Sequence, residues 1–261
     1  MYISLLTVNT GESTGRLWLS NRYRVHQRLC MAFPSAERKE KDPAFLCRYQ
    51  PSDFLNAHAT DYQHNHVHGL RTSEQAFLFR MDPRPGGNAV IVVQSSVKPD
   101  WDYAFHNAGF LLAGHRTFED DLSFNADEKL RFWLEANPTR KVGTLSKTER
   151  LGHVSAAGRD KNGKRVAVPI GSLGKWLDDK AKESGFRIRQ PLSITPGYVY
   201  FAKPQTEGHR LRSVRFEGTL EVTDTAAFRE AIIRGIGPAK GFGFGLLSVA
   251  SLRGVNYAYT V

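Results

Sequence analysis

The chain of 261 residues carries 36 Lys and Arg against 26 Asp and Glu, a net charge of +10, and is long enough for one large domain or two of ordinary size. No run of about 18 apolar residues is present, which excludes a membrane-spanning helix, so we expect no membrane partner. The first residues enter a strand pattern instead of a signal segment. Two cysteines, Cys30 and Cys47, are too few for a disulfide framework, so we expect a reduced, cytoplasmic protein.

The excess positive charge is confined to the second half of the chain. Residues 1–126 hold 13 basic and 13 acidic side chains, whereas residues 127–261 hold 23 basic and 13 acidic ones. Solubility alone does not require such segregation. We therefore interpret it as a sign of a polyanionic partner such as a nucleic acid.

The first half begins with a strand and a helix. Residues 2–9 alternate as a half-buried strand does, and the glycines around residues 11–15 indicate a loop. A helix is expected from Asn21 to about Phe33, because its apolar side chains recur on one face and a proline follows. Residues 34–75 are charged or irregular and are interpreted as an elaborated connection.

Two further strands and a weak helix complete this half. Residues 77–81 and 89–95 have the pattern of a hairpin with a longer loop. Residues 100–118 are expected to close the first domain, which we place at residues 1–122, and to contain a helix with poorly defined ends.

The second half, residues 123–261, repeats this order of elements. The expected elements are a strand at 130–136, a helix at 172–184, strands at 198–203 and 211–222, a helix at 225–234 and a strand at 246–252. Each half thus reads β-α-β-β-α-β, the ferredoxin-like order. We predict an α+β fold of two tandem ferredoxin-like domains.

Residues 139–168 form a basic segment within the second half. It contains eight Lys and Arg, opposed only by Glu149 and Asp160. Asn162-Gly163 is a strong hairpin turn signal. The sequence therefore predicts a projecting basic ribbon.

A glycine-rich run from Gly235 to Gly245 separates the helix at 225–234 from the last strand. A dinucleotide-binding loop would follow a strand and open a helix, and a Walker loop would place Ser or Thr after Lys240, so both are excluded. The remaining interpretations are a loop whose backbone N–H groups approach a polyanion, or a glycine helix cap with a tight connection.

This run, G-I-G-P-A-K-G-F-G-F-G-L-L-S-V, resembles the C-terminal loop of the CRISPR-associated repeat-RNA endoribonucleases of the Cascade (subtype I-E) complex. Stretches beginning at Met1, Asn21 (N-R-Y-R-V-H) and Leu130 (L-R-F-W-L-E-A-N-P) fit the same family in the same order. The resemblance runs from residue 1 to about residue 252. It implies tandem ferredoxin-like domains and, as partners, a CRISPR repeat RNA hairpin and other Cascade subunits.

Tyr23 and His26 are the candidate catalytic residues. Three positions apart on one helix, they are neighbours at the margin of its apolar stripe. Residue types alone would favour packing roles for both, but the resemblance implies that Tyr-x-x-His is the catalytic pair. The implied reaction is attack of the RNA 2′-oxygen on the adjacent phosphate, with His26 as general base or acid.

The remaining candidates would bind RNA or stabilise charge on the phosphate. Lys240, Arg24 and Arg28 are candidates for the stabilising cation, and the sequence does not rank them. The expected RNA-binding residues are Arg22, Arg24, Arg28, Lys161, Lys164, Arg165, Arg212, Arg215, Gly237, Lys240, Gly241 and Gly243.

We expect no metal and no other cofactor. His64, His66 and His68 could supply ligands from one strand face, but no Cys, Asp or Glu stands at a recognised spacing from them. Two other functional classes remain open: a non-catalytic RNA-binding module in which His26 only packs, and a structural backbone protein of a Cascade-like complex.

Overall fold

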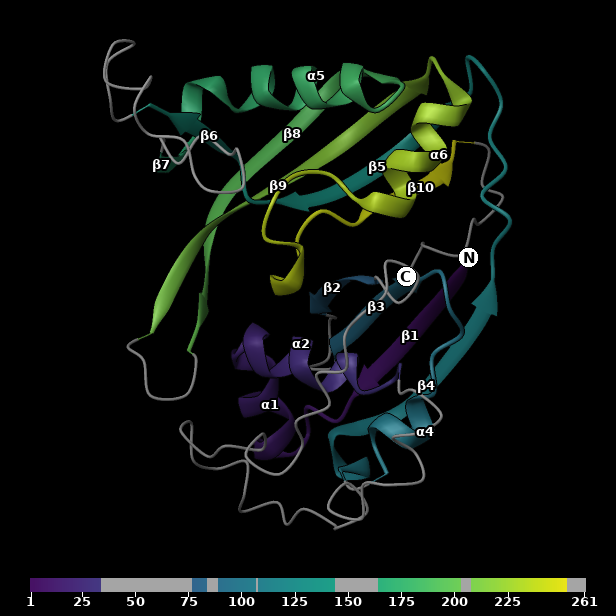
Figure 1. Cartoon of the computed structure of the whole chain (residues 1–261), viewed down its shortest axis with the longest axis vertical. Coiled ribbons are helices and arrows are strands. Elements are labelled where there is room, and N and C mark those ends of the chain that lie inside the picture. Colours follow the sequence, from purple (N-terminus) through teal and green to yellow (C-terminus); the bar gives the residue numbers. More distant parts are fainter. Residues whose placement is uncertain (34–76, 84–88, 107, 144–163, 203–207, 253–261) are drawn as a thin grey trace, which may run out of the picture.

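The computed structural model describes residues 1–33, 77–83, 89–106, 108–143, 164–202 and 208–252. These residues form two four-stranded antiparallel sheets, one from each half of the chain, and a separate two-stranded ribbon. Figure 1 shows the first sheet below the second, with the helix α5 on the far side of the second sheet.

The first domain contains four strands in the order β2-β3-β1-β4. Its elements are β1 (Tyr2–Val8), α1 (Ser13–Ser20), α2 (Arg22–Cys30), β2 (Phe77–Pro83), β3 (Ala89–Ser95), α4 (Trp101–Ala104), the 3₁₀ turn η4 (Gly109–Leu111) and β4 (Leu112–Glu119). This is the strand order of a ferredoxin-like fold, with the second helix reduced to a single turn.

Strand alternation gives the first sheet two buried faces. Leu6 and Val8 of β1 share a core with Val25 and Leu29 of α2, on the face that the helices cover. The opposite face buries the Ile3 cluster with Val90 and Val92. Since both faces are covered, β3 reads as an apolar run without clear alternation.

The second domain repeats the topology in the order β10-β5-β9-β8. Its elements are β5 (Lys129–Ala136), β6 (Thr139–Val142), β7 (Lys164–Ala167), the 3₁₀ turn η6 (Ile170–Ser172), α5 (Leu173–Glu183), β8 (Phe186–Phe201), β9 (His209–Val222), α6 (Thr225–Arg234), the 3₁₀ turn η7 (Lys240–Phe242) and β10 (Leu247–Ser251). The prediction of two tandem ferredoxin-like domains is confirmed.

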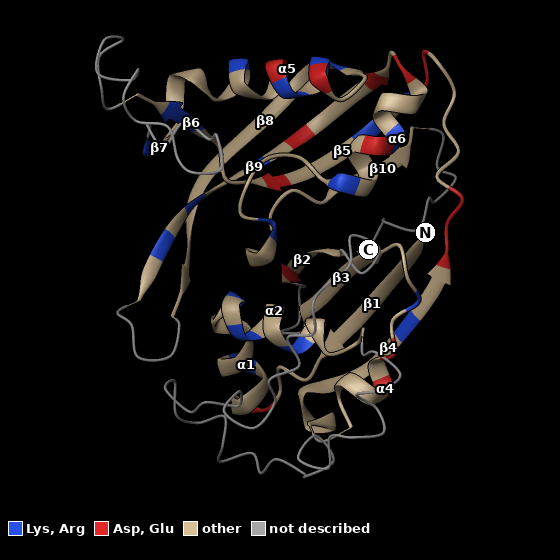
Figure 2. Ribbon diagram, viewed as in Figure 1, with Lys and Arg blue, Asp and Glu red and all other residues tan. Residues whose placement is uncertain are grey.

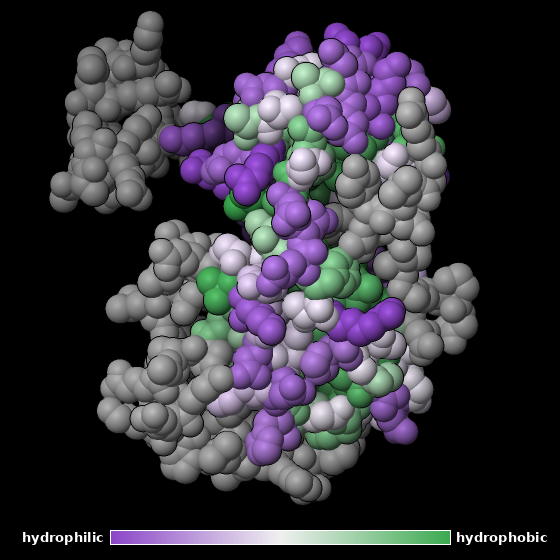
Figure 3. All heavy atoms as spheres, turned by 90° about the vertical axis from the view of Figure 1, so that its right-hand side faces the viewer, coloured by the Kyte–Doolittle hydropathy of each residue, from purple (hydrophilic) through white to green (hydrophobic). Residues whose placement is uncertain are grey.

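The two sheets meet through the face of each that carries polar residues. Gln94 Nε2 of β3 donates to the carbonyl oxygen of Ile232 in α6 at 2.7 Å. Arg80 of β2 hydrogen-bonds to Ser248 Oγ of β10, and its guanidinium lies 4.5 Å from the ring centre of Trp133 in β5. On the face shown in Figure 3, hydrophilic residues gather over the second domain, and hydrophobic residues reach the surface where the domains meet.

Two sequence-based expectations about elements are wrong. The segment interpreted as a loop before Asn21 contains the helix α1, and β8 starts at Phe186, well before the expected strand at 198–203. Residues 100–118 do contain a short helix, the single turn α4, which is followed by η4 and by most of the edge strand β4.

Two strands of the predicted basic ribbon, β6 and β7, pair with each other. Lys141 pairs with Arg165 and Val142 with Lys164, so residues 143–163 connect the two strands. Asn162 and Gly163 lie outside the described residues, so the turn predicted there stays a prediction. Within the described part of the chain, no helix is long and apolar enough to span a membrane.

Candidate active site at the domain seam

His26 lies on α2 at the seam between the two domains. Its ring stacks 6.1 Å from the ring of Phe79 and lies 5.5 Å from that of Phe77, both on β2 (centroid distances). Cys30, one turn along α2, places its sulfur 3.7 Å from His26 Nε2 and donates to the His26 carbonyl oxygen at 2.8 Å. His26 and Tyr23 both remain partly exposed. The imidazole is thus held in orientation without being fully buried.

The glycine run of the second domain lies against this histidine. A Cβ atom on Gly241 would stand 3.4 Å from His26 Nε2, so the loop backbone passes directly over the ring. Gly243 has φ +79°, and a Cβ there would lie 3.0 Å from Phe79 Cε2. Both positions therefore bring backbone close to the first domain. A Cβ on Gly241 would make an ordinary contact, whereas a Cβ on Gly243 would be tight and at a φ that favours glycine.

The loop is fixed at both ends by backbone hydrogen bonds. Ile236 N donates to the Gly245 carbonyl oxygen at 2.8 Å, and Gly245 N donates to the Glu135 carbonyl oxygen at 2.8 Å. Between these ends, Gly237 lies close to the Trp176 ring of α5. The run is therefore a closed loop rather than a single helix cap, although Gly235 also ends α6.

Arg22, next to Tyr23 on α2, joins the loop to the second sheet. Its Nη2 is 2.9 and 3.1 Å from the two carboxylate oxygens of Glu135, and Nη1 donates to the Phe242 carbonyl oxygen at 3.0 Å. Ser213 also donates to Glu135 Oε1 at 2.6 Å. The guanidinium is buried and already engaged, so an RNA contact by Arg22 would require these bonds to break. That contact stays a prediction.

A long hairpin of β8 and β9 reaches from the second domain to the start of α2 (Figure 1). Asn21 Nδ2 donates to the Ala202 carbonyl oxygen at 2.9 Å, and Ala202 N donates to Asn21 Oδ1 at 3.3 Å. The same Oδ1 accepts from Tyr23 N and so caps the helix. Phe201 packs against Phe242 with ring centroids 4.2 Å apart and the rings tilted by 40°. The second domain therefore determines where α2 begins.

The three candidate cations lie in different surroundings. Arg28 is 1% exposed and donates to the Ala104 carbonyl oxygen inside the first domain, and Arg24 is also buried. Lys240 is half-buried in the turn that covers His26. Burial lowers the pKa of Lys240 from the ordinary lysine value, and the positive charge of Arg234 lowers it further.

Other candidate RNA-binding residues lie on the ribbons of the second domain (Figure 2). Lys164 and Arg165 are exposed on β7. Arg212 of β9 donates to the Val168 carbonyl oxygen at 2.9 Å, and Arg215 pairs with Glu217 at 2.7 Å. Lys161 lies outside the described residues. The seam thus brings Tyr23, His26, Gly241 and Lys240 together, but not the ribbon residues.

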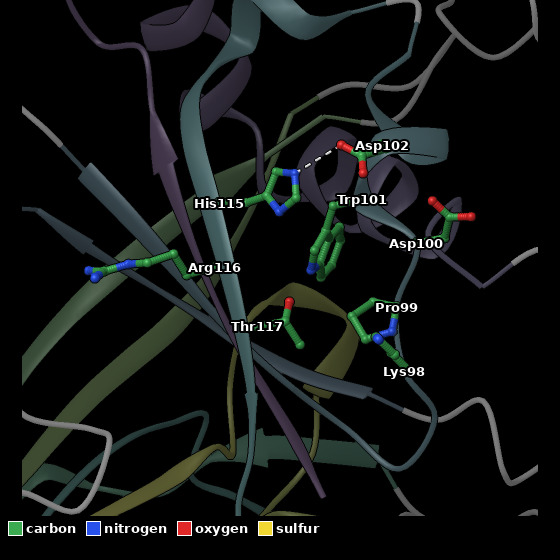
Figure 4. Close-up of a pocket in the computed structure, with 8 residues that line it drawn as sticks. All are labelled: Lys98, Pro99, Asp100, Trp101, Asp102, His115, Arg116 and Thr117. Carbon is green, nitrogen blue, oxygen red and sulfur yellow. Dashed lines mark hydrogen bonds and ion pairs between the residues drawn. The ribbon is translucent and has the colours of Figure 1, made fainter.

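Two other parts of the protein carry residue types suited to chemistry. The described residues contain no group of three or more His, Cys, Asp or Glu that could hold a metal, and His64, His66 and His68 lie outside them. A cavity of about 580 Å³ between α4 and β4 holds His115, whose Nε2 is 3.1 Å from Asp102 Oδ1 (Figure 4). Because β4 is the edge strand opposite β2, this cavity is separate from the seam.

Sequence reasoning missed four residues that shape the site: Asn21 as an inter-domain contact, Phe77, Phe79 and Glu135. A signal existed for Glu135, which is a carboxylate inside the otherwise apolar stretch 132–136 of β5. A charged residue at such a position requires a partner when buried. No local pattern indicated that Phe77 and Phe79 would meet a histidine on α2.

The fold and the seam define a tandem ferredoxin-like protein with basic ribbons and a histidine beneath a glycine loop. The chain belongs to the family of CRISPR-associated proteins, since the family model described as "CRISPR associated protein" matches residues 60–251. It is 31% identical to the CRISPR system Cascade subunit CasE of Escherichia coli, over 97% of this chain and 100% of that protein.

Two further comparisons agree with this family. The CRISPR-associated endoribonuclease Cse3 of Thermus thermophilus is 26% identical over 96% of this chain and its own full length. A solved structure of CRISPR endoribonuclease Cse3 bound to a 19-nt RNA superposes with a TM-score of 0.66, at 24% identity, covering 96% of this chain and 100% of that one. The structural likeness establishes the fold.

Proposed function

We propose that this protein is an endoribonuclease that binds the stem-loop of CRISPR repeat RNA and cleaves at its 3′ side. Its relatives are named as an endoribonuclease and as a Cascade subunit, and the related solved structure holds RNA. After cleavage the protein remains on its hairpin product as a Cascade subunit. In this proposal residues 1–122 form the domain with the catalytic helix and residues 123–261 form the main RNA-binding domain.

The reaction is an internal transesterification. The 2′-oxygen of the nucleotide before the cut attacks the adjacent phosphorus, and the 5′-oxygen of the next nucleotide leaves. The products are a 2′,3′-cyclic phosphate and a 5′-hydroxyl end. One proton leaves the 2′-hydroxyl and one joins the 5′-oxygen, so one group that exchanges protons near neutral pH, such as His26, supports the reaction.

The position of His26 is the observation that carries this proposal. Its ring is partly exposed at the seam, oriented by Cys30 and Phe79, and lies below the backbone of Gly241. A buried packing histidine would not need a glycine loop from another domain above it. Tyr23, one helical turn earlier and also partly exposed, positions the 2′-oxygen or the phosphate.

Lys240 is the best placed of the three candidate cations. It precedes Gly241 in the turn over His26, whereas Arg28 is directed into the first domain. A partly desolvated ammonium interacts strongly with charge that develops on phosphate oxygens. Arg24 is buried and is therefore a weaker candidate.

RNA binding is assigned to the basic ribbons and the loop. Lys161, Lys164 and Arg165 meet phosphates of the stem, with Arg212 and Arg215 on β9. An A-form helix is recognised mostly by shape and backbone, because its major groove is too narrow for side chains to read. Gly237, Gly241 and Gly243 let the loop backbone approach the first domain and the RNA closely.

A single substitution in the RNA tests the mechanism. We compare a ribo stem-loop with one that carries a 2′-deoxy nucleotide before the cut, each with and without EDTA. We expect the deoxy RNA to be bound but not cut, and EDTA to leave cleavage of the ribo RNA intact. Cleavage of the deoxy RNA, or inhibition by EDTA, would indicate a metal-activated water and overturn the mechanism. A protein that binds both RNAs and cuts neither would be a binding module.

A further inference from the structure

Two tyrosines stand on one outward face of the β8–β9 hairpin. Tyr198 and Tyr200 are 50% and 63% exposed, and they are the only aromatic residues among the large exposed hydrophobic side chains in the part of the chain that the structure describes. Across the ladder, Tyr198 pairs with Arg212 and Tyr200 with Arg210. These four residues form what we call the tyrosine–arginine face.

The tyrosine–arginine face alternates aromatic and cationic groups at close range. The guanidinium carbon of Arg210 lies 4.9 Å from the ring centre of Tyr198. Arg210 is exposed, whereas Arg212 is partly buried and donates to the Val168 carbonyl oxygen. Flat rings and a flat guanidinium at such spacing offer stacking surfaces together with positive charge.

The other face of the same hairpin is fixed against the candidate active site. Val199 and Phe201 are only 9% exposed, and the Phe201 ring packs against Phe242 of the glycine loop. The hairpin also holds Asn21 at the start of α2 through Ala202. The tyrosine–arginine face is therefore a positioned surface beside the helix that carries His26.

We infer that the tyrosine–arginine face binds unpaired nucleotides that flank the stem-loop, by stacking their bases on Tyr198, Tyr200 and Arg210. This inference rests on the proposed function and extends it to a single-stranded part of the substrate. Aromatic side chains combined with positive charge are the usual surface for single-stranded nucleic acid, since every base has a π-face. Bases inside a duplex stem are stacked on one another and present no such face.

Charge favours RNA over a protein partner on this surface. All of the net charge of +10 comes from residues 127–261, where the hairpin lies. The positive charge attracts an RNA phosphate backbone toward Arg210, and the bases of that strand then contact the tyrosine rings. The chemistry is the same for a 5′ or a 3′ flank, so the experiment has to separate the two.

The test measures affinity for four uncleavable stem-loops, each with the 2′-deoxy substitution. One is blunt, one has a 5′ single strand, one has a 3′ single strand, and one has the 3′ strand as abasic ribose phosphates. Base–aromatic stacking changes affinity by about 1–3 kcal/mol per base, or about 5- to 150-fold. We expect Tyr198→Ala and Tyr200→Ala to lose affinity in this range for one flanked RNA and to leave blunt RNA unaffected.

Matched variants separate stacking from other effects. Tyr198→Phe and Tyr200→Phe keep the rings and should retain wild-type affinity. The RNA with the abasic strand should bind the wild-type protein less tightly than the RNA with bases, because only its phosphates contact the face. The Ala variants should bind this abasic RNA as tightly as the wild-type protein does. Ile170→Ala removes an equally exposed apolar side chain from the same domain and should change nothing.

Three results would overturn the inference. If the Ala variants lose as much affinity for blunt RNA as for flanked RNA, the face binds the stem. If they lose as much affinity for the abasic RNA, the effect comes from charge and not from stacking. If they lose no affinity for any RNA, the face binds a protein partner instead. These readings use binding only. Failure of the proposed cleavage chemistry would instead appear as a cut deoxy stem-loop, so the two failures are distinguishable.

Discussion

Arg22 on α2 and Glu135 on β5 form a buried, bidentate ion pair between the two domains, with Nη2 at 2.9 and 3.1 Å from the carboxylate oxygens. The same guanidinium donates to the Phe242 carbonyl oxygen, beside the residue that covers His26. The pair therefore joins the helix that carries His26, the glycine loop and the second sheet. It also explains why an arginine beside Tyr23 need not contact RNA.

Removing Glu135 should destabilise the protein strongly. Glu135→Ala leaves the Arg22 charge buried without its carboxylate, which typically costs about 3–5 kcal/mol of unfolding free energy. Urea denaturation measures the change, and cleavage should fall as the glycine loop loses its hold. Glu183→Ala, which breaks an exposed pair with Lys180 on α5, is the control and should cost at most about 1 kcal/mol. A similar loss of unfolding free energy in both variants would show that the Arg22–Glu135 pair does not stabilise the contact between the domains.

Removing the imidazole should abolish most cleavage but preserve binding. General acid–base groups contribute about 10²–10⁴-fold, so His26→Ala should lose at least this much in single-turnover cleavage of the stem-loop. Tyr23→Phe should lose less if the ring only positions substrate. His115→Ala changes a histidine in the separate cavity of Figure 4 and should cleave normally. Full activity of His26→Ala would remove His26 from the mechanism.

Glycines two residues apart in the loop should respond differently. Gly243→Val puts a β-branched residue at φ +79° against Phe79 and Arg22, and should cost about 2 kcal/mol or more in thermal or urea unfolding. Gly241→Ala has room at 3.4 Å from His26 Nε2, so it should fold normally and slow cleavage. Lys240→Ala should be less damaging to stability than Gly243→Val. Equal and mild effects at all three positions would reduce the loop to a connection.

The basic ribbon should determine the salt dependence of binding. Changing Lys161, Lys164 and Arg165 together to Ala should weaken stem-loop binding and lower the slope of log affinity against log salt by roughly one per lost phosphate contact. Changing Lys175, Lys180 and Lys182 on α5 removes the same charge from a helix on the far side of the second sheet (Figure 1). This control should keep the slope. An unchanged slope in the ribbon variant would exclude the ribbon from the RNA site.

The lowered pKa of Lys240 predicts a pH-dependent stability. Its unfolded value is about 10.5 and its folded pKa is lower, so between the two values the unfolded chain binds more protons. Stability contributed by this site therefore rises with pH across that window. Lys240→Met should be more stable than the wild-type protein at neutral pH, and the difference should shrink as pH approaches 10.5.

Urea denaturation at several pH values measures this difference in stability. The rate of RNA cleavage by Lys240→Met shows whether the lost positive charge contributes to the reaction. Lys182→Met, a charge removal on α5, is the matched control. A difference between Lys240→Met and wild type that stays constant with pH would contradict desolvation of the Lys240 ammonium. Unchanged cleavage by Lys240→Met would exclude Lys240 as the stabilising cation.

Elements set by local patterns agree between sequence and structure. The helix at 225–234 and the strand at 89–95 match α6 and β3 residue for residue, and Asp224 caps α6 through the N–H groups of Ala226 and Ala227. Caps, apolar periodicity and the order of elements are properties of short segments. The sequence by itself therefore determined the ferredoxin-like order of both halves and the family resemblance.

Long-range packing determined the rest. The helix α1 lacks a side-chain cap and forms because Trp18 is fully buried in the first core. Pro191 and Pro196 lie within β8, which is the edge strand of its sheet, where proline is tolerated because an N–H that faces away from the ladder makes no bond. At the seam, His26 contacts Gly241 and Arg22 pairs with Glu135, although these residues come from segments far apart in the chain. Only the packing of the two folded domains against each other brings them within contact distance.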